Sequence, residues 1–261
     1  MKPIIEIENL TLNFGDKRIL DSVSLQIFKG DYLSIIGPNG AGKTSLLKCI
    51  MRIYTGYQGT ILVKDVPTTN LGQKRLARSI SYVPQANGRI FPFTVEEFVM
   101  LGRYPYLSPF ASFTAQDRIA AKEALSLTGL QCYADRLMTT LSGGERQIAF
   151  IAAAVAQGAE IMLLDEPTTF LDPKHEAEIY SILNRLNREL GMTIVTVTHD
   201  INMAALQSQR IVILKQGQIV STGDAKQIMR NEVLAPAFDK QFVFLAHPIT
   251  GQPIIAPEVQ P

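Results

Sequence analysis

The stretch at 37–44, GPNGAGKT, has the residue types and the spacing of a phosphate-binding loop. It fits G-x-x-x-x-G-K-[ST] and lies between an apolar run at 32–36 and a helical pattern at 43–53. The glycines let backbone N–H groups wrap a phosphate chain, and the helix N-terminus adds a positive dipole end. Lys43 is expected to reach the β- and γ-phosphates and Thr44 to ligate Mg²⁺. The flanking strand and helix favour this interpretation over a glycine turn that only caps a helix.

Two carboxylates, Asp165 and Glu166, directly follow the apolar run at 161–164. Parallel sheets place their ligand sites at the carboxyl ends of strands. Asp165 is the better candidate to hold Mg²⁺ through water, and Glu166 to orient and activate an attacking water as general base. Taken alone, the pair would indicate only an acidic helix start.

The stretch LSGGER at 141–146 is a second glycine-rich turn before an apolar helical pattern. Ser142 followed three residues later by Glu145 is a capping box, which needs no ligand. Two adjacent glycines, however, cost helix propensity and are useful mainly where the backbone must approach something closely. The combination suits an anion, and capping alone is the alternative.

Composition and patterning define the elements that must position these residues. The chain has 261 residues, 46% hydrophobic and 19% charged, with a net charge of +1, which indicates a globular protein and disfavours nucleic-acid binding. Cys49 and Cys132 indicate neither a disulfide framework nor a metal cluster and fit a reducing cytosol. The N-terminus alternates like a strand rather than a signal peptide, and the longest apolar run, 148–156, is too short to span a bilayer.

The periodicity predicts an α/β fold. Helices are expected at 43–53, within 114–158 and at 173–190, and a C-terminal hairpin within 242–256. Strands are expected at 3–14, 23–28, 32–36, 60–63, 161–164, 193–197, 211–214 and 219–220, of which those at 161–164, 193–197 and 211–214 are apolar enough to be buried parallel strands.

Together these motifs resemble those of ATP-binding cassette (ABC) ATPases over about residues 3–225. The shared motifs, in the family's order, are GPNGAGKT, Gln85 in YVPQ, LSGGE, LLDEP, FLD at 170–172 and His199 in VTHD. The resemblance implies a P-loop NTPase with a mixed sheet core and an N-terminal antiparallel β subdomain. It also implies a helical subdomain that carries the LSGGE motif. The expected divisions are a core at 1–84 and 159–225, a helical subdomain at 85–158 and an extension at 226–261.

The resemblance also implies that each ATP, with its Mg²⁺, is sandwiched between two copies of the chain. Ser142 and Gly144 would then contact the γ-phosphate held by the other copy, and Asp172 would meet the partner as well as cap a helix. The implied nucleotide-binding residues are Phe14, Gly37, Pro38, Asn39, Gly40, Ala41, Gly42, Lys43, Thr44, Ser45, Ser142, Gly143, Gly144 and Asp172.

The same resemblance assigns the catalytic and metal roles. Catalytic residues would be Glu166, His199, which would hydrogen-bond the γ-phosphate, and Gln85, which would contact the metal or the lytic water. Thr44, Gln85 and Asp165 would hold the metal. Phe14 would stack on adenine, with core packing as the alternative. His175 and His247 are expected to be surface or loop residues.

The chain has twelve Phe and eight Tyr residues, and seven of these aromatic residues lie in one segment at 91–113. Any single ring could be core, but a contiguous set near Gln85 favours a groove for a partner's helix. The segment and the tail PITGQPIIAP at 248–257 resemble those of importer subunits for ferric siderophores, haem and cobalamin, and some close relatives move molybdate or tungstate.

The expected partners are a second copy and two membrane permease subunits, contacted through 86–113, with an extracytoplasmic binding protein contacted indirectly. The expected location is therefore the cytoplasmic face of the membrane. A cassette ATPase that serves iron–sulfur cluster assembly is the rival hypothesis. Ile148 and Ala153 depart from the family, because arginines are usual there, and the departure is expected to alter local salt bridges rather than ATP hydrolysis.

Overall fold

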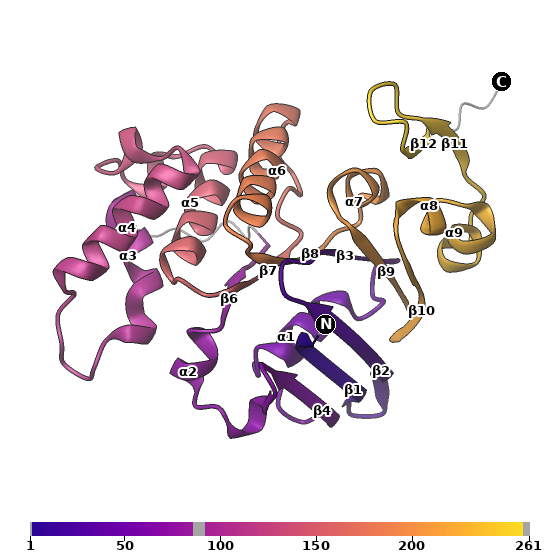
Figure 1. The fold of residues 1–261 in the computed structure, drawn as a ribbon, viewed down its shortest axis with the longest axis horizontal. Helices are drawn as coiled ribbons and strands as arrows, with labels where there is room; N and C mark the ends of the chain where they lie inside the picture. Colours follow the sequence, from indigo (N-terminus) through magenta and orange to yellow (C-terminus); the bar gives the residue numbers. More distant parts are fainter. Residues whose placement is uncertain (1, 86–91, 258–261) are drawn as a thin grey trace. The chain divides into compact units, whose positions relative to one another are not determined.

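The computed structural model describes residues 2–85 and 92–257, and these fall into two compact units. Unit 1 contains the chain up to residue 70 and from residue 193 onward, and unit 2 contains residues 71–192 (Figure 1). The core, helical-subdomain and extension boundaries expected from the sequence stay a prediction. Within residues 2–85 and 92–257, no helix has both the length and the apolar character that crossing a bilayer demands.

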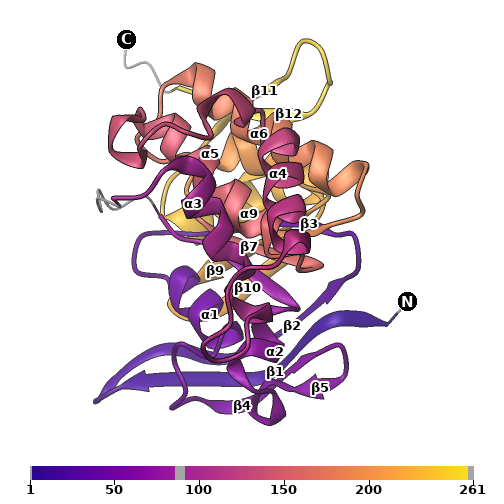
Figure 2. The same cartoon turned by 90° about the vertical axis from the view of Figure 1, so that its left-hand side faces the viewer.

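Unit 1 begins with an antiparallel sheet in the order β2-β1-β4-β5 (Figure 2). Its strands are β1 (Pro3–Phe14), β2 (Lys17–Phe28), β4 (Gln58–Val63) and β5 (Val66–Pro67). The buried residues Ile7 and Leu10 of β1 are three apart, which breaks the period of two. A register shift lies between them, where Asn9 has a φ of 50°. This bulge returns Leu10 to the buried face.

Unit 1 also contains the parallel strands β3 (Tyr32–Ile36), β8 (Thr193–Val197) and β9 (Arg210–Lys215). The strand order is β10-β9-β3-β8, and β10 (Gln218–Gly223) is antiparallel to β9, so the sheet is mixed. Every residue of β3 and β8 is buried, as expected for parallel strands covered on both faces. The helices of unit 1 are α1 (Lys43–Ile50), α7 (Ile201–Gln207), α8 (Ala225–Ile228) and α9 (Asn231–Phe238), and a 3₁₀ turn lies at Thr68–Asn70.

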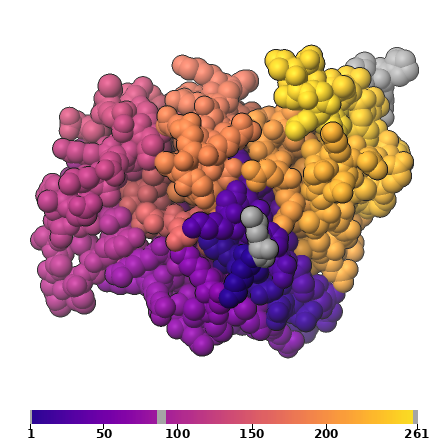
Figure 3. All heavy atoms as spheres, viewed as in Figure 1, coloured from indigo at the N-terminus to yellow at the C-terminus, as the bar shows by residue number. Residues whose placement is uncertain are grey.

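The expected C-terminal hairpin is present as β11 (Val243–Ala246) and β12 (Pro253–Ala256). It lies in the yellow part of the surface in Figure 3. The Asn202 side chain in α7 donates Nδ2–H to the Ile255 carbonyl at 3.0 Å and accepts from the Ile255 N–H at 2.6 Å. Phe242 and Phe244 pack on the cluster of buried residues that α7, α8 and α9 form with β3 and β9. The hairpin is thus fastened to α7.

Unit 2 is built on the parallel pair β6 (Ile80–Val83) and β7 (Ile161–Asp165). Its helices are α2 (Gln73–Ala77), α3 (Val95–Met100), α4 (Ala115–Thr128), α5 (Gly143–Ala156) and α6 (Pro173–Arg188). Short 3₁₀ helices occur at Leu101–Tyr106, Gln131–Tyr133 and Met138–Thr140. The helical pattern expected within 114–158 is thus two helices, because Gly129 ends α4 in the left-handed conformation.

A buried ion pair connects three of these helices. Asp117 in the first turn of α4 accepts from Arg103 Nε at 3.0 Å, and Arg103 also donates to the Ala156 carbonyl at the end of α5. The two side chains are 6% and 11% exposed. The Thr114 hydroxyl and N–H, and then Arg103, hold the pKa of Asp117 below its ordinary value. The carboxylate form is therefore the one that the fold stabilises.

We predict that Asp117→Ala lowers the free energy of unfolding by about 3 kcal/mol, because it leaves Arg103 buried without its carboxylate. Since the folded-state pKa is depressed, the stabilisation is present above the unfolded-state pKa and is lost as pH falls through the folded-state value. Urea denaturation at neutral and acidic pH measures both effects. A variant as stable as the parent at neutral pH would contradict this role, and Lys2→Ala, which breaks an exposed pair with Asp65, is the matched control.

Candidate functional site

The phosphate loop, residues 37–45, places a positive charge among its own backbone carbonyls. Lys43 is only 7% exposed. Its Nζ donates to the Gly37 carbonyl at 2.7 Å and to the Pro38 carbonyl at 3.1 Å. Desolvation strengthens the attraction of such an ammonium for an anion. The loop therefore has the charge and the location that a triphosphate requires.

The start of α1 adds backbone donors to the same place. Gly42 is the N-cap with a φ of 102°, and no side chain caps the helix. A Cβ at Gly42 would lie 2.7 Å from the Ile19 carbonyl, so glycine is required there both by conformation and by space. Thr44 and Ser45 occupy the first turn. The first N–H groups of a helix have no intrahelical acceptor, and they suit phosphate oxygens.

Strand pairing in unit 1 brings His199 to the edge that carries the phosphate loop. β3 and β8 are adjacent and parallel, with Ile35 opposite Val197, and the Thr198 N–H donates to the Ile35 carbonyl. The loop follows β3 and His199 follows β8 by two residues. Asp200 caps α7 by accepting from the Met203 N–H at 2.9 Å. His199, which is exposed, therefore lies on a short, well-anchored turn.

Phe14 ends β1 and is 49% exposed. Its ring meets Tyr54 edge to face, with centroids 5.0 Å apart. The structure therefore rules against the core-packing alternative for Phe14, while adenine stacking stays a prediction. Tyr54 also lies under the Lys48 ammonium, 5.3 Å from the ring centroid. Sequence reasoning did not identify Tyr54.

Strand pairing in unit 2 brings Gln85 to the edge that carries the two carboxylates. Val83 of β6 pairs with Leu164 of β7, so Gln85 and Asp165 leave the same end of two parallel strands. Asp165 is 4% exposed and accepts from the Tyr82 hydroxyl at 3.2 Å. This hydrogen bond joins β6 to β7 next to the end that Gln85 follows.

Glu166 has a φ of 51°, in the left-handed region that non-glycine residues seldom adopt. Its Oε2 accepts from the Thr169 hydroxyl at 2.9 Å. Backbone strain of this kind is concentrated at functional sites. Asp165 is thus held by Tyr82 and Glu166 by Thr169, and their different roles stay a prediction.

The Ser142 turn, residues 141–146, forms the capping box expected from its sequence. Ser142 Oγ accepts from the Glu145 N–H at 3.1 Å, and Glu145 Oε2 accepts from the Ser142 N–H at 2.7 Å. Ser142 and Gly143 are exposed, whereas Gly144 is buried. Local capping thus accounts for the serine and the glutamate, and contact with an anion stays a prediction.

Asp172 caps α6 and is exposed, as a partner-facing residue must be. Its Oδ1 accepts from the Lys174 and His175 N–H groups at 3.0 Å, and its Oδ2 lies 2.6 Å from His175 Nδ1. The His175 N–H bond, followed by the ring bond, lowers the pKa of Asp172. His247 lies in the hairpin loop, as expected, whereas His175 lies in the first turn of α6 with its side chain partly exposed.

The two departures in α5 have local explanations. Ile148 is 1% exposed, so an arginine there would bury a charge. Ala153 lies at a close crossing, because a Cβ on Gly102 would be 2.1 Å from the Ala153 carbonyl. Both residues therefore belong to the packing of α5 against its neighbours.

The aromatic segment divides into core and surface rings. Phe98 is buried and meets Phe150 edge to face at 5.0 Å. Tyr106 lies beneath the Arg103 guanidinium at 4.0 Å, and Tyr104 lies 5.4 Å from the Lys74 ammonium. The exposed apolar and aromatic residues of this segment are Phe93, Leu101, Tyr104, Tyr106 and Phe110. Phe91 and the rest of 86–91 lie outside the described residues.

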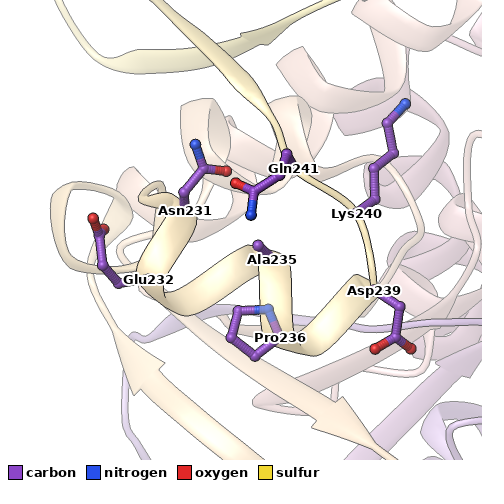
Figure 4. Close-up of a pocket in the computed structure, with 7 residues that line it drawn as sticks. All are labelled: Asn231, Glu232, Ala235, Pro236, Asp239, Lys240 and Gln241. Atoms are coloured by element: carbon purple, nitrogen blue, oxygen red, sulfur yellow. The ribbon is translucent and has the colours of Figure 1, made fainter.

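A pocket of about 590 Å³ lies over α9 (Figure 4). Its lining residues are Asn231, Glu232, Ala235, Pro236, Asp239, Lys240 and Gln241. None of them is an expected site residue, so this pocket is separate from the candidate nucleotide site.

The residues present fit ATP better than a metal bound by protein alone. Within residues 2–85 and 92–257, no group of three or more His, Cys, Asp or Glu side chains is arranged to hold a metal ion. Mg²⁺ characteristically takes only one or two carboxylates and completes its shell with water and phosphate oxygens. Asp165 and Gln85, which leave the same end of the two strands of unit 2, therefore suit an ion that arrives with the nucleotide, and Thr44 as a further ligand stays a prediction.

Comparison with known proteins agrees with this chemistry. Residues 20–169 match the ABC transporter family. The iron(3+)-hydroxamate import ATP-binding protein FhuC of Bacillus subtilis (strain 168) is 38% identical over 96% of this chain and 93% of its own length. The ferric enterobactin transport ATP-binding protein FepC of Escherichia coli (strain K12) is 36% identical over 96% and 92%.

Solved structures give the same result. A structure described as a metal-chelate type ABC transporter in an inward-facing conformation has a TM-score of 0.86 and 28% identity, over 99% of this chain and 98% of that one. A dimeric ATP-binding cassette in a post-hydrolysis state, bound to ADP and Pi, has a TM-score of 0.72 and 31% identity, over 84% and 98%. The chain belongs to the ABC transporter family, in which it is an ATP-binding and ATP-hydrolysing cassette of the α/β P-loop NTPase fold.

Proposed function

We propose that this chain is the ATPase subunit of an importer and that it works as a homodimer. Each nucleotide lies between the phosphate loop of one copy and the Ser142 turn of the other. One observation carries the proposal: the chain presents two helix starts suited to phosphate, α1 with the buried Lys43 and α5 with the exposed Ser142 and Gly143. The dimeric ADP- and Pi-bound relative supports it.

The hydrolytic roles follow from the surroundings of each group. Lys43 binds the β- and γ-phosphate oxygens and stabilises the charge that develops on them. Glu166, oriented by the Thr169 hydroxyl, accepts the proton of the attacking water. His199 donates to a γ-phosphate oxygen, and Gln85 orients the water. When bound, Mg²⁺ neutralises charge on the phosphates; Thr44, Gln85 and Asp165 would hold it.

The proposed cargo is a metal chelate of the ferric siderophore class, with haem and cobalamin as the related possibilities. Relatives with 38%, 36% and 34% identity are import proteins for iron(3+)-hydroxamate, ferric enterobactin and petrobactin, and each match covers at least 92% of the relative. The cargo passes through the permease and not through this subunit. The assignment therefore comes from the relatives and not from a binding pocket in this chain.

The exposed residues Phe93, Leu101, Tyr104, Tyr106 and Phe110 are the proposed docking surface for a permease helix. Single exposed apolar side chains are common, but several within one short segment indicate an interface. Lys74 and Arg78 lie over Tyr104 and Tyr106 and add positive charge at its border. Docking there would hold the chain at the cytoplasmic face of the membrane, as two copies beneath two permease subunits.

We predict that Glu166→Gln lowers the ATP turnover rate by about a hundredfold or more, because the amide cannot accept a proton. ATP-driven dimerisation should persist, since the shape of the side chain is kept. Steady-state phosphate release and sedimentation velocity with ATP measure the two properties. Glu189→Gln, at the exposed end of α6, is the matched control. Turnover that survives in the Glu166 variant would refute the general-base role.

We predict that Tyr104→Ser weakens association with the cognate permease by about 2 kcal/mol, as expected for an aromatic residue central to an interface. Leu190→Ser is the matched control, because Leu190 is 54% exposed but lies outside the proposed surface. Co-purification from detergent and titration in nanodiscs measure the association. Equal binding by the Tyr104 and Leu190 variants would remove this surface from the proposal.

A further inference from the structure

The start of α5 lies directly against the start of α6, and the contact is between Gly144 and His175. A Cβ on Gly144 would lie 2.2 Å from Cγ, 2.3 Å from Cδ2 and 2.5 Å from Cβ of His175. Because His175 Cβ is itself too close, no rotation of the ring would make room. Figure 1 shows the two helices side by side.

The two glycines of the Ser142 turn differ in this respect. A Cβ on Gly143 would meet only Leu171 Cδ2, at the ordinary distance of 3.8 Å. Neither residue has a positive φ, so conformation does not explain the requirement for glycine. Gly144 is required because His175 occupies the space above it, which is a reason internal to the chain.

The same histidine holds the carboxylate of Asp172. His175 Nδ1 lies 2.6 Å from Asp172 Oδ2, while the Lys174 and His175 N–H groups donate to Oδ1. The ionised carboxylate has no proton to give, so Nδ1 must carry the hydrogen and donate it. The His175 side chain is 20% exposed, and its ring is fixed on one side by Asp172 and on the other by Gly144.

We propose that His175 is a positioning residue that joins the Ser142 turn to Asp172, so that both reach the partner copy as one rigid edge. The inference rests on the proposed function, in which both elements face the second copy. In that arrangement, a loose Ser142 turn would have to be ordered at every dimerisation, and that cost would weaken the closed dimer. His175 orders the Ser142 turn in the isolated chain, so dimerisation does not have to, and it does this without contacting the nucleotide.

Three variants of the Glu166→Gln chain separate the two contacts of His175. His175→Asn keeps a donor near Asp172 and loses the ring, His175→Phe keeps a ring and loses the donor, and His175→Ala loses both. The dissociation constant of the ATP-driven dimer is measured by sedimentation, and the affinity of the isolated chain for a fluorescent ATP analogue by titration. His247→Ala, in the hairpin loop, is the matched histidine control.

We expect His175→Ala to raise the dimer dissociation constant by about tenfold or more, the effect of losing a hydrogen bond to a charged group. His175→Asn and His175→Phe should have smaller effects, and nucleotide affinity of the isolated chain should stay within about twofold. Dimerisation equal to that of the parent, or a parallel loss of nucleotide affinity, would overturn the inference.

Amide hydrogen exchange measured on the isolated chain tests the role of His175 without relying on dimerisation, and so without relying on the proposed function. In His175→Ala, the amides at the starts of both α5 and α6 should exchange faster than in the parent, because the two turns lose their common contact. Faster exchange at α6 alone would overturn the positioning role. If the parent itself fails to dimerise with ATP, the proposed function fails, while the exchange data still decide whether His175 joins the two turns.

Discussion

Parallel strand pairing is the constraint that brings the phosphate loop, Gln85, the two carboxylates and His199 to the ends of their strands. In unit 1 it makes the phosphate loop and His199 leave the same end of β3 and β8. In unit 2 it makes Gln85 and the two carboxylates leave the same end of β6 and β7. The strands are buried, so a shift in register would expose apolar side chains. The same shift would displace the catalytic groups that follow the strands. The strand register that packs the core is therefore the same register that sets the geometry of the site.

The residues that do chemistry were predictable where a short pattern imposes its own geometry. The phosphate loop, the capping box at Ser142 and the cap at Asp172 are of this kind, because each requires particular residue types at fixed spacing. The buried strands were predictable from their apolar runs. Short helices such as α2, α7 and α8 were not, because four to seven residues carry too little periodicity and depend on tertiary packing.

Contacts between segments distant in the sequence could not be predicted, for a different reason. The residue types of Gly144 and His175 do not indicate that the two residues are in contact. His175 also has the sequence context of an ordinary helix surface. Likewise, the positive φ of Glu166 and its bond to Thr169 arise from the turn after β7 and not from a pattern of residue types. The bulge at Asn9 is similar, since the irregular spacing in β1 shows only that the strand must deviate.

The central claim is that each nucleotide is shared between two copies, and a mixing experiment tests it most directly. Lys43→Ala removes the phosphate-loop half of the site, and Ser142→Arg blocks the other half. Each variant alone should retain no occluded ATP in the Glu166→Gln background. After mixing, the heterodimer contains one site in which both halves are intact, so the account predicts that it retains a single occluded ATP. A mixture that retains no more ATP than the separate variants would contradict the shared site.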